Sequence, residues 1–551
     1  MEKIRGSESK VRVGRSLNDA EKQHVAKRRE KVLQSLIQQN LTISPDVVPN
    51  IAVMGSGGGL RAMVGLLGSL SQLKKEGLLD SITYLSGVSG STWCMASLYK
   101  EADWSTKLET VKQNIAKRMA DGKVNWLDQA NKLAKYFFTK DNFSLTDIWS
   151  ALAVSSMVNE VDEHSVTEQR DKDANNPYPI YTVIDKQSKY DRLKSDPWFE
   201  ITPDESGYSL MGAFVNTSFF GSKFENGNKI KDQPQMDMLY LQGLCGSVLA
   251  DMESLLSQLL TLIKAKTKTT AKSVVLPKVQ NGYQMIQTLV ELNLCALKGG
   301  DCSVYQKTLK NLVTSESKLA GVLNSPTSKK ANPKADIQDT TLQVCNSFFD
   351  VFGEKRSWDS VWIAIVRSLE KIISWVWGTT YNYVNKMKVV GVHPSILSSV
   401  TREYEDAGLL NNSPYMSVLR KERNIDLIIS LDFSAGDQLA TVSQIAQQCR
   451  ELYIPFPALP ALPVGGTIEP QDFYVFRGTG KTPTVIHIPL FNKVNCKGEV
   501  KKWQDTYKTD QLHYTATMIS DLLEKAALNI KNNKQNLLNE IKYAIERKKL
   551  G

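Results

Sequence analysis

The chain has 551 residues, of which 42% are hydrophobic and 23% charged, and its formal net charge is +10. These proportions are typical of a globular protein and exclude a fibrous or largely disordered chain. The length exceeds that of one typical core, so we expect a main domain that carries an inserted subdomain.

The first residues, MEKIRGSESKVRVG, are too polar for a signal peptide, and no apolar run has the length of a membrane span. The seven cysteines lack the spacing of a metal site or of a disulfide framework. We therefore expect reduced thiols in a cytoplasmic protein that is soluble or peripherally bound to membranes.

A basic amphipathic helix is predicted over residues 16–39, within a terminal region of residues 1–45. The apolar side chains Val25, Val32, Leu33, Leu36 and Ile37 share one face, and the basic side chains Lys27, Arg28, Arg29 and Lys31 lie opposite them.

The segment of residues 47–70, VVPNIAVMGSGGGLRAMVGLLGSL, begins with an apolar stretch, which is followed by three consecutive glycines and then by a helical pattern. Glycines allow close approach to the backbone, and the unpaired N–H groups at the start of a helix favour negative charge. The loop is therefore predicted to hold an anion: a dinucleotide pyrophosphate, a nucleotide triphosphate or the oxyanion of ester hydrolysis.

Two of these three anions fit poorly. Leu60 stands where the third glycine of a dinucleotide fingerprint belongs, and no Gly-Lys-Ser/Thr ending of a P-loop follows the glycines. A second glycine motif, at residues 478–483, lacks the first P-loop glycine and contains a helix-breaking proline, so it indicates a hairpin turn.

The oxyanion reading gains support from SITYLSGVSGSTW, residues 81–93. A short buried strand over 82–86 leads into Gly-Val-Ser-Gly-Ser and then into a helix. A serine on a tight turn from strand to helix is typical of a nucleophile elbow, which makes Ser89 the candidate nucleophile.

Residues 106–162 are predicted to be mainly helical. Two polar stretches, residues 264–273 and 325–339, indicate exposed or disordered loops. The stretch 358–378 contains four tryptophans, which fits either a buried helix or a surface that meets lipid.

Strands are predicted at 427–431, 473–476 and 485–489. The final pattern, over 519–550, predicts one long helix in the basic amphipathic region 511–551, and residues 521–551 hold seven Lys and Arg against four Asp and Glu.

Several motifs in the same order resemble the catalytic domain of group IV cytosolic phospholipases A2: GSGGGLRAM, SGVSGSTW, FFGSKF, WGTTYNY, EDAGLLNNSPY and DLIISLDFSAGD. The likeness spans roughly residues 20 to 510 and is greatest to the gamma branch, which lacks a calcium-binding C2 domain. The glycine motif begins about fifty residues from Met1, which leaves no room for such a β-sandwich ahead of it.

The resemblance implies an α/β fold of the patatin-like type, with a central mixed sheet flanked by helices. It implies a catalytic domain over 46–510 with a cap inserted at about 175–400. By motif match, the nucleophile is Ser89, the base is Asp406, and the oxyanion-hole residues are Gly58 and Gly59, while Arg61 and Arg423 bind phosphate.

Other roles stay open from the residues alone. Asp406 is also an ordinary turn residue before Gly408, and both arginines also fit surface ion pairs. Asp432 and Asp437, near a strand end, are alternative bases on local grounds. His487 completes the chain order of a Ser, Asp, His triad.

We expect a calcium-independent phospholipase A2 or lysophospholipase that needs no cofactor or metal ion. Its expected partners are a phospholipid membrane surface and a glycerophospholipid or lysophospholipid substrate, without nucleic acid. A lysophospholipid transacylase or general serine esterase, and an inactive lipid-binding protein, are the alternatives. The chain ends in ERKKLG and has its last cysteine at Cys496, so no prenyl anchor is expected.

Overall fold

The computed structural model describes residues 10–191, 197–270, 277–316, 319–320, 333–460 and 469–550. The chain forms two compact units: unit 1 comprises residues up to Gly122, Asp162–Leu249 and Thr380 onward, and unit 2 comprises Lys123–Val161 and Ala250–Thr379.

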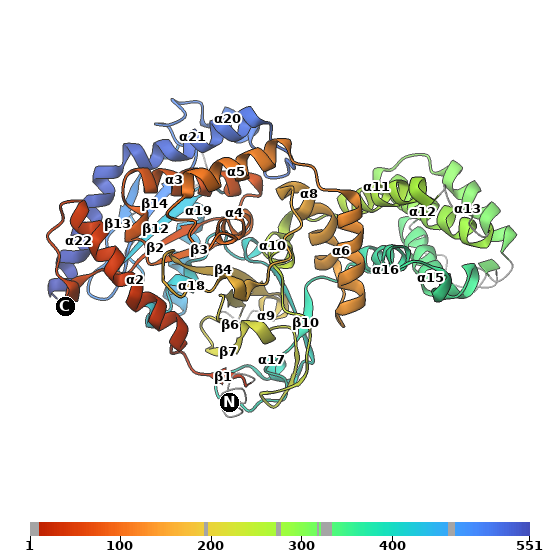
Figure 1. The fold of residues 1–551 in the computed structure, drawn as a ribbon, viewed down its shortest axis with the longest axis horizontal. Coiled ribbons are helices and arrows are strands. Elements are labelled where there is room, and N and C mark those ends of the chain that lie inside the picture. The colour runs from red at the N-terminus through yellow and green to blue at the C-terminus, as the bar shows by residue number, and fades with distance from the viewer. Residues whose placement is uncertain are drawn as a thin grey trace. The chain divides into compact units, whose positions relative to one another are not determined.

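A twelve-stranded mixed sheet forms the centre of unit 1 (Figure 1). The strand order along it is β1-β7-β6-β5-β4-β3-β2-β12-β14-β13, with β11 paired to β4 and to β10. The strands are β1 (Arg12–Val13), β2 (Ile51–Gly55), β3 (Tyr84–Gly87), β4 (Tyr178–Asp185), β5 (Trp198–Ile201), β6 (Glu205–Tyr208), β7 (Ala213–Asn216), β10 (Thr379–Tyr381), β11 (Thr401–Asp406), β12 (Leu427–Asp432), β13 (Tyr474–Phe476) and β14 (Thr484–Pro489). A separate hairpin joins β8 (Lys223–Glu225) to β9 (Asn228–Lys231).

The five strands β14, β12, β2, β3 and β4 run parallel to one another. Every residue of β2, β3 and β12 is buried, because helices cover both faces of this part of the sheet. The predicted strands at 82–86, 427–431, 473–476 and 485–489 are all present, and the turn at 478–483 joins the antiparallel pair β13 and β14.

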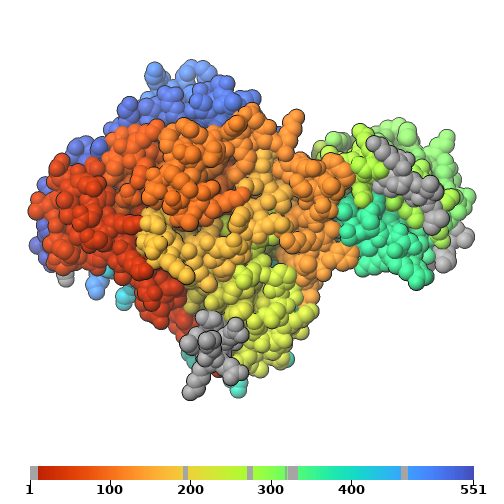
Figure 2. Space-filling view, in the orientation of Figure 1, coloured from red at the N-terminus to blue at the C-terminus, as the bar shows by residue number. Residues whose placement is uncertain are grey.

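The helices of unit 1 include one near the amino terminus and two at the carboxy terminus. Figure 2 shows the amino-terminal part in red and the carboxy-terminal part in blue next to each other. The helices are α2 (Asp19–Gln38), α3 (Leu60–Lys75), α4 (Gly90–Tyr99), α5 (Leu108–Asp121), α9 (Lys186–Tyr190), α10 (Met238–Cys245), α17 (Pro394–Ser398), α18 (Tyr415–Val418), α19 (Ala440–Glu451), α20 (Val500–Thr506), α21 (Ala516–Asn532) and α22 (Lys534–Leu550).

The terminal helices differ from their predictions in detail. Arg28, expected on the solvent face of α2, is buried and donates to carbonyl groups that include those of Ile82 and Asn175. The predicted single helix at 519–550 is two helices, α21 and α22, separated at Asn533. Several basic groups of this region bind other segments of unit 1, as Lys548 does with Asp426 at 2.7 Å.

The described part of unit 2 is mainly helical and contains α6 (Trp126–Thr139), α7 (Leu145–Ile148), the π-helix η3 (Trp149–Val154), α8 (Ser155–Val158), α11 (Met252–Thr270), α12 (Pro277–Lys298), α13 (Ser303–Ser315), α15 (Pro333–Phe352) and α16 (Ser360–Ser374). The buried-helix interpretation of the tryptophan-rich stretch is correct for α16, in which Trp362 is fully buried. Trp358 and Trp377, on either side of this helix, are also buried, and Trp375 is half-buried.

Three expectations about this part of the chain are corrected by the structure. The insertion expected at about 175–400 divides differently, since residues 178–231 supply β4 to β9 to unit 1. The described residues of the two polar stretches, 264–270 and 333–339, belong to the helices α11 and α15, and 271–273 and 325–332 lie outside the described residues. Finally, Cys295 and Cys302 form a disulfide rather than two reduced thiols.

Candidate active site

Ser89 occupies the turn between β3 and α4. Its backbone has φ 51° and ψ −125°, a conformation that side-chain-bearing residues rarely adopt. Strain of this kind persists where the surrounding structure enforces it, and it is expected of the serine in a nucleophile elbow. The local geometry therefore matches the prediction from the Gly-Val-Ser-Gly-Ser pattern.

The glycine loop lies directly against this elbow. A β-carbon at Gly57 would stand 2.9 Å from Cβ of Ser89, and one at Gly90 would stand 1.9 Å from the carbonyl oxygen of Gly59. Only residues without a side chain permit such close approach. The two segments, about thirty residues apart in sequence, thus form one site.

The loop has free donors at the start of α3. Within the part of the chain that the structure describes, the N–H groups of Gly58 and Gly59 donate to no protein acceptor. Gly58 has φ 151° and Gly59 has φ 58°, so their backbone conformations also favour glycine. Paired N–H groups at a helix start are the arrangement that stabilises an oxyanion.

Asp406 ends β11 and lies beside Ser89. β11 pairs with β4, where Asp406 stands opposite Val183, and β4 runs alongside β3. The Ser89 hydroxyl is close enough to be one of the groups that lower the pKa of Asp406. Among the described residues, Oγ of Ser89 has no partner in hydrogen-bond geometry, although its side chain is buried. Catalytic hydrogen bonds are often long before substrate binds.

Burial controls the ionisation of Asp406. Its side chain is inaccessible to solvent, which raises the pKa to about 7. The backbone N–H groups of Gly408, at 2.8 Å, and Val248, at 3.2 Å, oppose this shift. Asp406 thus makes the turn contact with Gly408 expected of an ordinary turn residue, and it also has the pKa of a base that works near neutral pH.

Arg61 is buried next to the glycine loop. Its guanidinium donates to the carbonyl oxygens of Phe433 and Tyr507 and to the Thr509 hydroxyl. A β-carbon at Gly58 would stand 3.0 Å from Nη2 of Arg61. The side chain therefore holds the loops around Gly58 together.

Arg423 is not available to a phosphate, which corrects the motif-based expectation. All five of its N–H donors are taken by the carboxylates of Glu21 and Glu200 and by the Ser417 carbonyl. Arg423 is 1% exposed, and Arg420 also binds Glu200. This cluster of two arginines and two glutamates, hereafter the buried ion cluster, joins α2 to β5.

The structure places His487 away from Ser89. His487 pairs with Ser430, which pairs with Met54, which in turn pairs with Ser86. Three strand spacings, about 14 Å, therefore separate His487 from the strand that leads to Ser89. The imidazole instead contacts Gln438 and Ser430, and it lies 3.7 Å from Asp432.

The other two candidate bases also have structural partners. Asp432 accepts hydrogen bonds from Thr441 and from the N–H of Ser434. Asp437 accepts from the N–H of Leu439 at the start of α19. Sequence reasoning did not anticipate the turn η6 (Ser247–Leu249), which contacts Asp406, because its short polar and apolar residues carry no motif.

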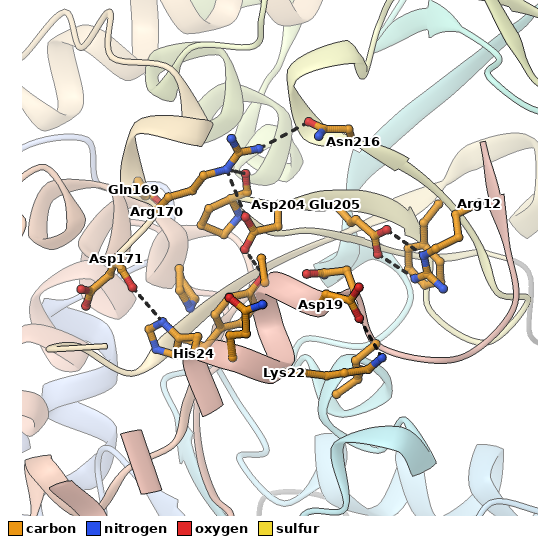
Figure 3. A pocket seen from close by; sticks show the side chains of 18 of the residues that line it. Arg12, Asp19, Lys22, His24, Gln169, Arg170, Asp171, Asp204, Glu205 and Asn216 are labelled. Atoms are coloured by element: carbon orange, nitrogen blue, oxygen red, sulfur yellow. Dashed lines mark hydrogen bonds and ion pairs between the residues drawn. The ribbon is translucent and has the colours of Figure 1, made fainter. Parts of the chain in front are cut away.

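A hollow of about 1570 Å³ lies elsewhere in unit 1, between the start of α2 and the turns near β6. Figure 3 shows that several of its charged side chains bind each other, as in the pairs Arg12 with Glu205 and Arg170 with Asp204. Neither Ser89 nor Asp406 lines it. We assign this hollow no ligand.

The chain is similar to known lipid hydrolases. Residues 51–289 match the model of the lysophospholipase catalytic domain. Cytosolic phospholipase A2 gamma of Mus musculus is 34% identical over 552 residues, covering 96% of this chain and 91% of the relative, and the Homo sapiens counterpart is 32% identical, covering 97% and 96%. The human GIVD cytosolic phospholipase A2 structure matches with a TM-score of 0.68 over 98% of this chain and 68% of that one, at 20% identity.

The matched family model identifies a catalytic domain of the lysophospholipase type, and the matched structure shows that its fold is α/β. More narrowly, the chain belongs to the cytosolic phospholipase A2 family, and the gamma proteins are among its relatives. No helix within the described ranges is both long and apolar enough for a membrane span.

Proposed function

We propose that this protein is a phospholipase A2 or lysophospholipase that cleaves fatty-acyl esters of glycerophospholipids through an acyl-Ser89 intermediate. The observation that carries the proposal is the convergence of Ser89, the glycine loop and a buried Asp406 with a pKa of about 7. The family relationship supports the substrate class.

In the proposed mechanism, Asp406 accepts the Ser89 proton as Oγ attacks the ester carbonyl carbon. The N–H groups of Gly58 and Gly59 bind the resulting oxyanion. When the tetrahedral intermediate collapses, Asp406 returns the proton to the leaving alcohol oxygen of the lipid. Asp406 then deprotonates a water molecule, whose oxygen attacks the carbonyl carbon of the acyl-Ser89 ester. As this second tetrahedral intermediate collapses, the bond to Oγ breaks, Asp406 returns the proton to Oγ of Ser89, and the fatty acid is released.

Arg61 is the proposed phosphate ligand. Its Nη2 lies beside Gly58, and its contact with the Thr509 hydroxyl is one that a phosphate oxygen could replace. A guanidinium suits phosphate because both its charge and its donor geometry match.

The proposed chemistry uses a carboxylate and backbone donors and needs no metal ion at the reacting ester. We expect hydrolysis of a phosphatidylcholine with two different acyl chains to continue at an unchanged rate in excess EGTA. Chromatography of the released fatty acids measures the activity and identifies the cleaved position. Activity that EGTA abolishes and calcium restores would contradict calcium independence. Transfer of the acyl group to added lysolipid, in place of fatty-acid release, would favour the transacylase alternative.

We also propose that the protein acts peripherally at anionic membrane surfaces in the cytoplasm, as its net charge of +10 suggests. Each basic residue near such a surface contributes about 1 kcal/mol at low screening. Sedimentation with anionic vesicles should therefore decrease as salt is raised from low to physiological concentration. Binding that does not change with salt would contradict this proposal.

A further inference from the structure

The turn η6 (Ser247–Leu249) contacts Asp406 at two points. The backbone N–H of Asp406 donates to Oγ of Ser247 at 3.0 Å, and the N–H of Val248 donates to Oδ2 of Asp406 at 3.2 Å. Leu249 reaches the glycine loop, since a β-carbon at Gly59 would stand 3.1 Å from its methyl group. One short turn thus contacts both the candidate base and the candidate oxyanion hole.

The position of this turn is fixed by the helix that starts at the elbow. Trp93 of α4 donates to the carbonyl oxygen of Gln242 in α10 at 2.9 Å. A β-carbon at Gly246 would stand 2.5 Å from the Trp93 ring, so the chain between α10 and the turn passes directly over this indole. Ser89, α4, α10 and Ser247 therefore form a continuous packed connection to Asp406.

We propose that Ser247 is a positioning residue for the reaction: its hydroxyl fixes the backbone of Asp406 and keeps the Val248 N–H on the carboxylate. This inference rests on the proposed Ser89 and Asp406 dyad. Ser247 does not touch the reacting atoms and acts only through Asp406.

The chemistry of the two contacts explains the expected effect. A hydrogen bond to a carboxylate oxygen favours the ionised form, and the Val248 N–H is one of the groups that oppose the effect of burial on the pKa of Asp406. When the Ser247 hydroxyl is removed, the N–H of Asp406 has no acceptor and the turn is no longer held in register. The carboxylate then loses a donor, so its protonated form becomes more favourable.

The test compares Ser247→Thr with Ser247→Val, because these two side chains have the same shape and differ in the hydroxyl. We expect Ser247→Thr to retain the wild-type rate and pH profile. We expect Ser247→Val to lower kcat about tenfold with an unchanged KM, the size of effect expected for one such hydrogen bond. The acid limb of its pH profile should move to higher pH.

Ser222→Ala is the matched control. Ser222 is buried in unit 1, and its Oγ also accepts a backbone N–H, from Gln233 at 3.0 Å, but it contacts neither Ser89 nor Asp406. We expect this variant to keep the wild-type acid limb. Equal kcat and equal pH profiles for Ser247→Thr and Ser247→Val would overturn the positioning role.

The inference and the proposed function fail separately. If Asp406→Asn retains turnover, the dyad itself is wrong. If Asp406→Asn is inactive while Ser247→Val behaves like the wild type, only the positioning role is wrong. If Ser247→Val does not fold, Ser247→Ala takes its place. The kcat and the acid limb of the pH profile are then compared between Ser247→Ala and Ser247→Thr, and a difference between them supports the positioning role.

Discussion

Asp406→Asn should lose turnover nearly as completely as Ser89→Ala, whereas His487→Ala should retain it. Loss of a general base costs about 10²- to 10⁴-fold, and groups that act as a unit often cost more. His487 is separated from the strand before Ser89 by two intervening strands, so its imidazole cannot accept the serine proton. The measurement is the hydrolysis rate of the three variants on the same vesicles.

Thermal melts provide the control for this comparison. His487 is fully buried and contacts Gln438, so its truncation is expected to lower the melting temperature without removing the catalytic groups. A folded His487→Ala that is as inactive as Ser89→Ala, together with an active Asp406→Asn, would replace the dyad by a triad.

The same pair of groups gives the reaction a defined pH dependence. Asp406 must be ionised to act as a base, and its pKa is about 7. Protonation removes the base, so kcat/KM should fall about tenfold for each pH unit below about 7.

The fold also holds this proton more tightly than the unfolded chain does. The stability of the wild type relative to Asp406→Asn should therefore decrease by about 4 kcal/mol as pH rises from about 4 to about 7.

Arg423→Ala should destabilise the protein by about 3–5 kcal/mol, because it leaves Glu21 and Glu200 buried with too little positive charge. The neighbouring arginines hold the pKa of Glu200 at about 2. A depressed carboxylate pKa adds stability above the unfolded value of about 4.3, and this stability is lost as pH falls toward about 2. Part of this acid sensitivity should be absent in Arg423→Ala. Thermal and denaturant unfolding at several pH values measure both effects.

Arg477→Ala is the matched control for the buried ion cluster. Arg477 also makes a two-point contact with a glutamate, Glu540, but the arginine side chain is 58% exposed while that of Glu540 is 6% exposed. Water screens the exposed guanidinium and only one carboxylate loses its partner, so this substitution should cost less, about 1–3 kcal/mol. If Arg423→Ala were as mild as Arg477→Ala and instead raised KM for phospholipid, the phosphate-binding role would be restored.

Local signals in the sequence were sufficient for the centre of the site. The glycine loop, the elbow and the strands at 427–431 and 485–489 each depend on residues within about ten positions of one another. Backbone conformation at Ser89 and Gly59 is a local property, so residue type and spacing predict it well.

Burial of charge could not be predicted in the same way. Nothing near Arg423 in sequence distinguishes it from a surface arginine, because its partner Glu21 is 402 residues away. The burial of Arg28 could not be predicted either, because the carbonyl groups that accept its hydrogen bonds belong to segments distant in sequence. The pairing of Cys295 with Cys302 depends on the turn between α12 and α13, which spacing alone does not reveal.

The position of β12 between β2 and β14 has a consequence for synthesis of the chain. Ribosomes add about 5–20 residues per second, so Arg423 emerges roughly 20–80 s after Glu21. During this interval β2 has an unpaired edge, and Glu21 lacks the guanidinium of Arg423 that it binds in the folded protein. The amino-terminal helix and the elbow therefore cannot reach their final packing until nearly four-fifths of the protein has been made, and the nascent chain exposes an edge of the kind that recruits other strands.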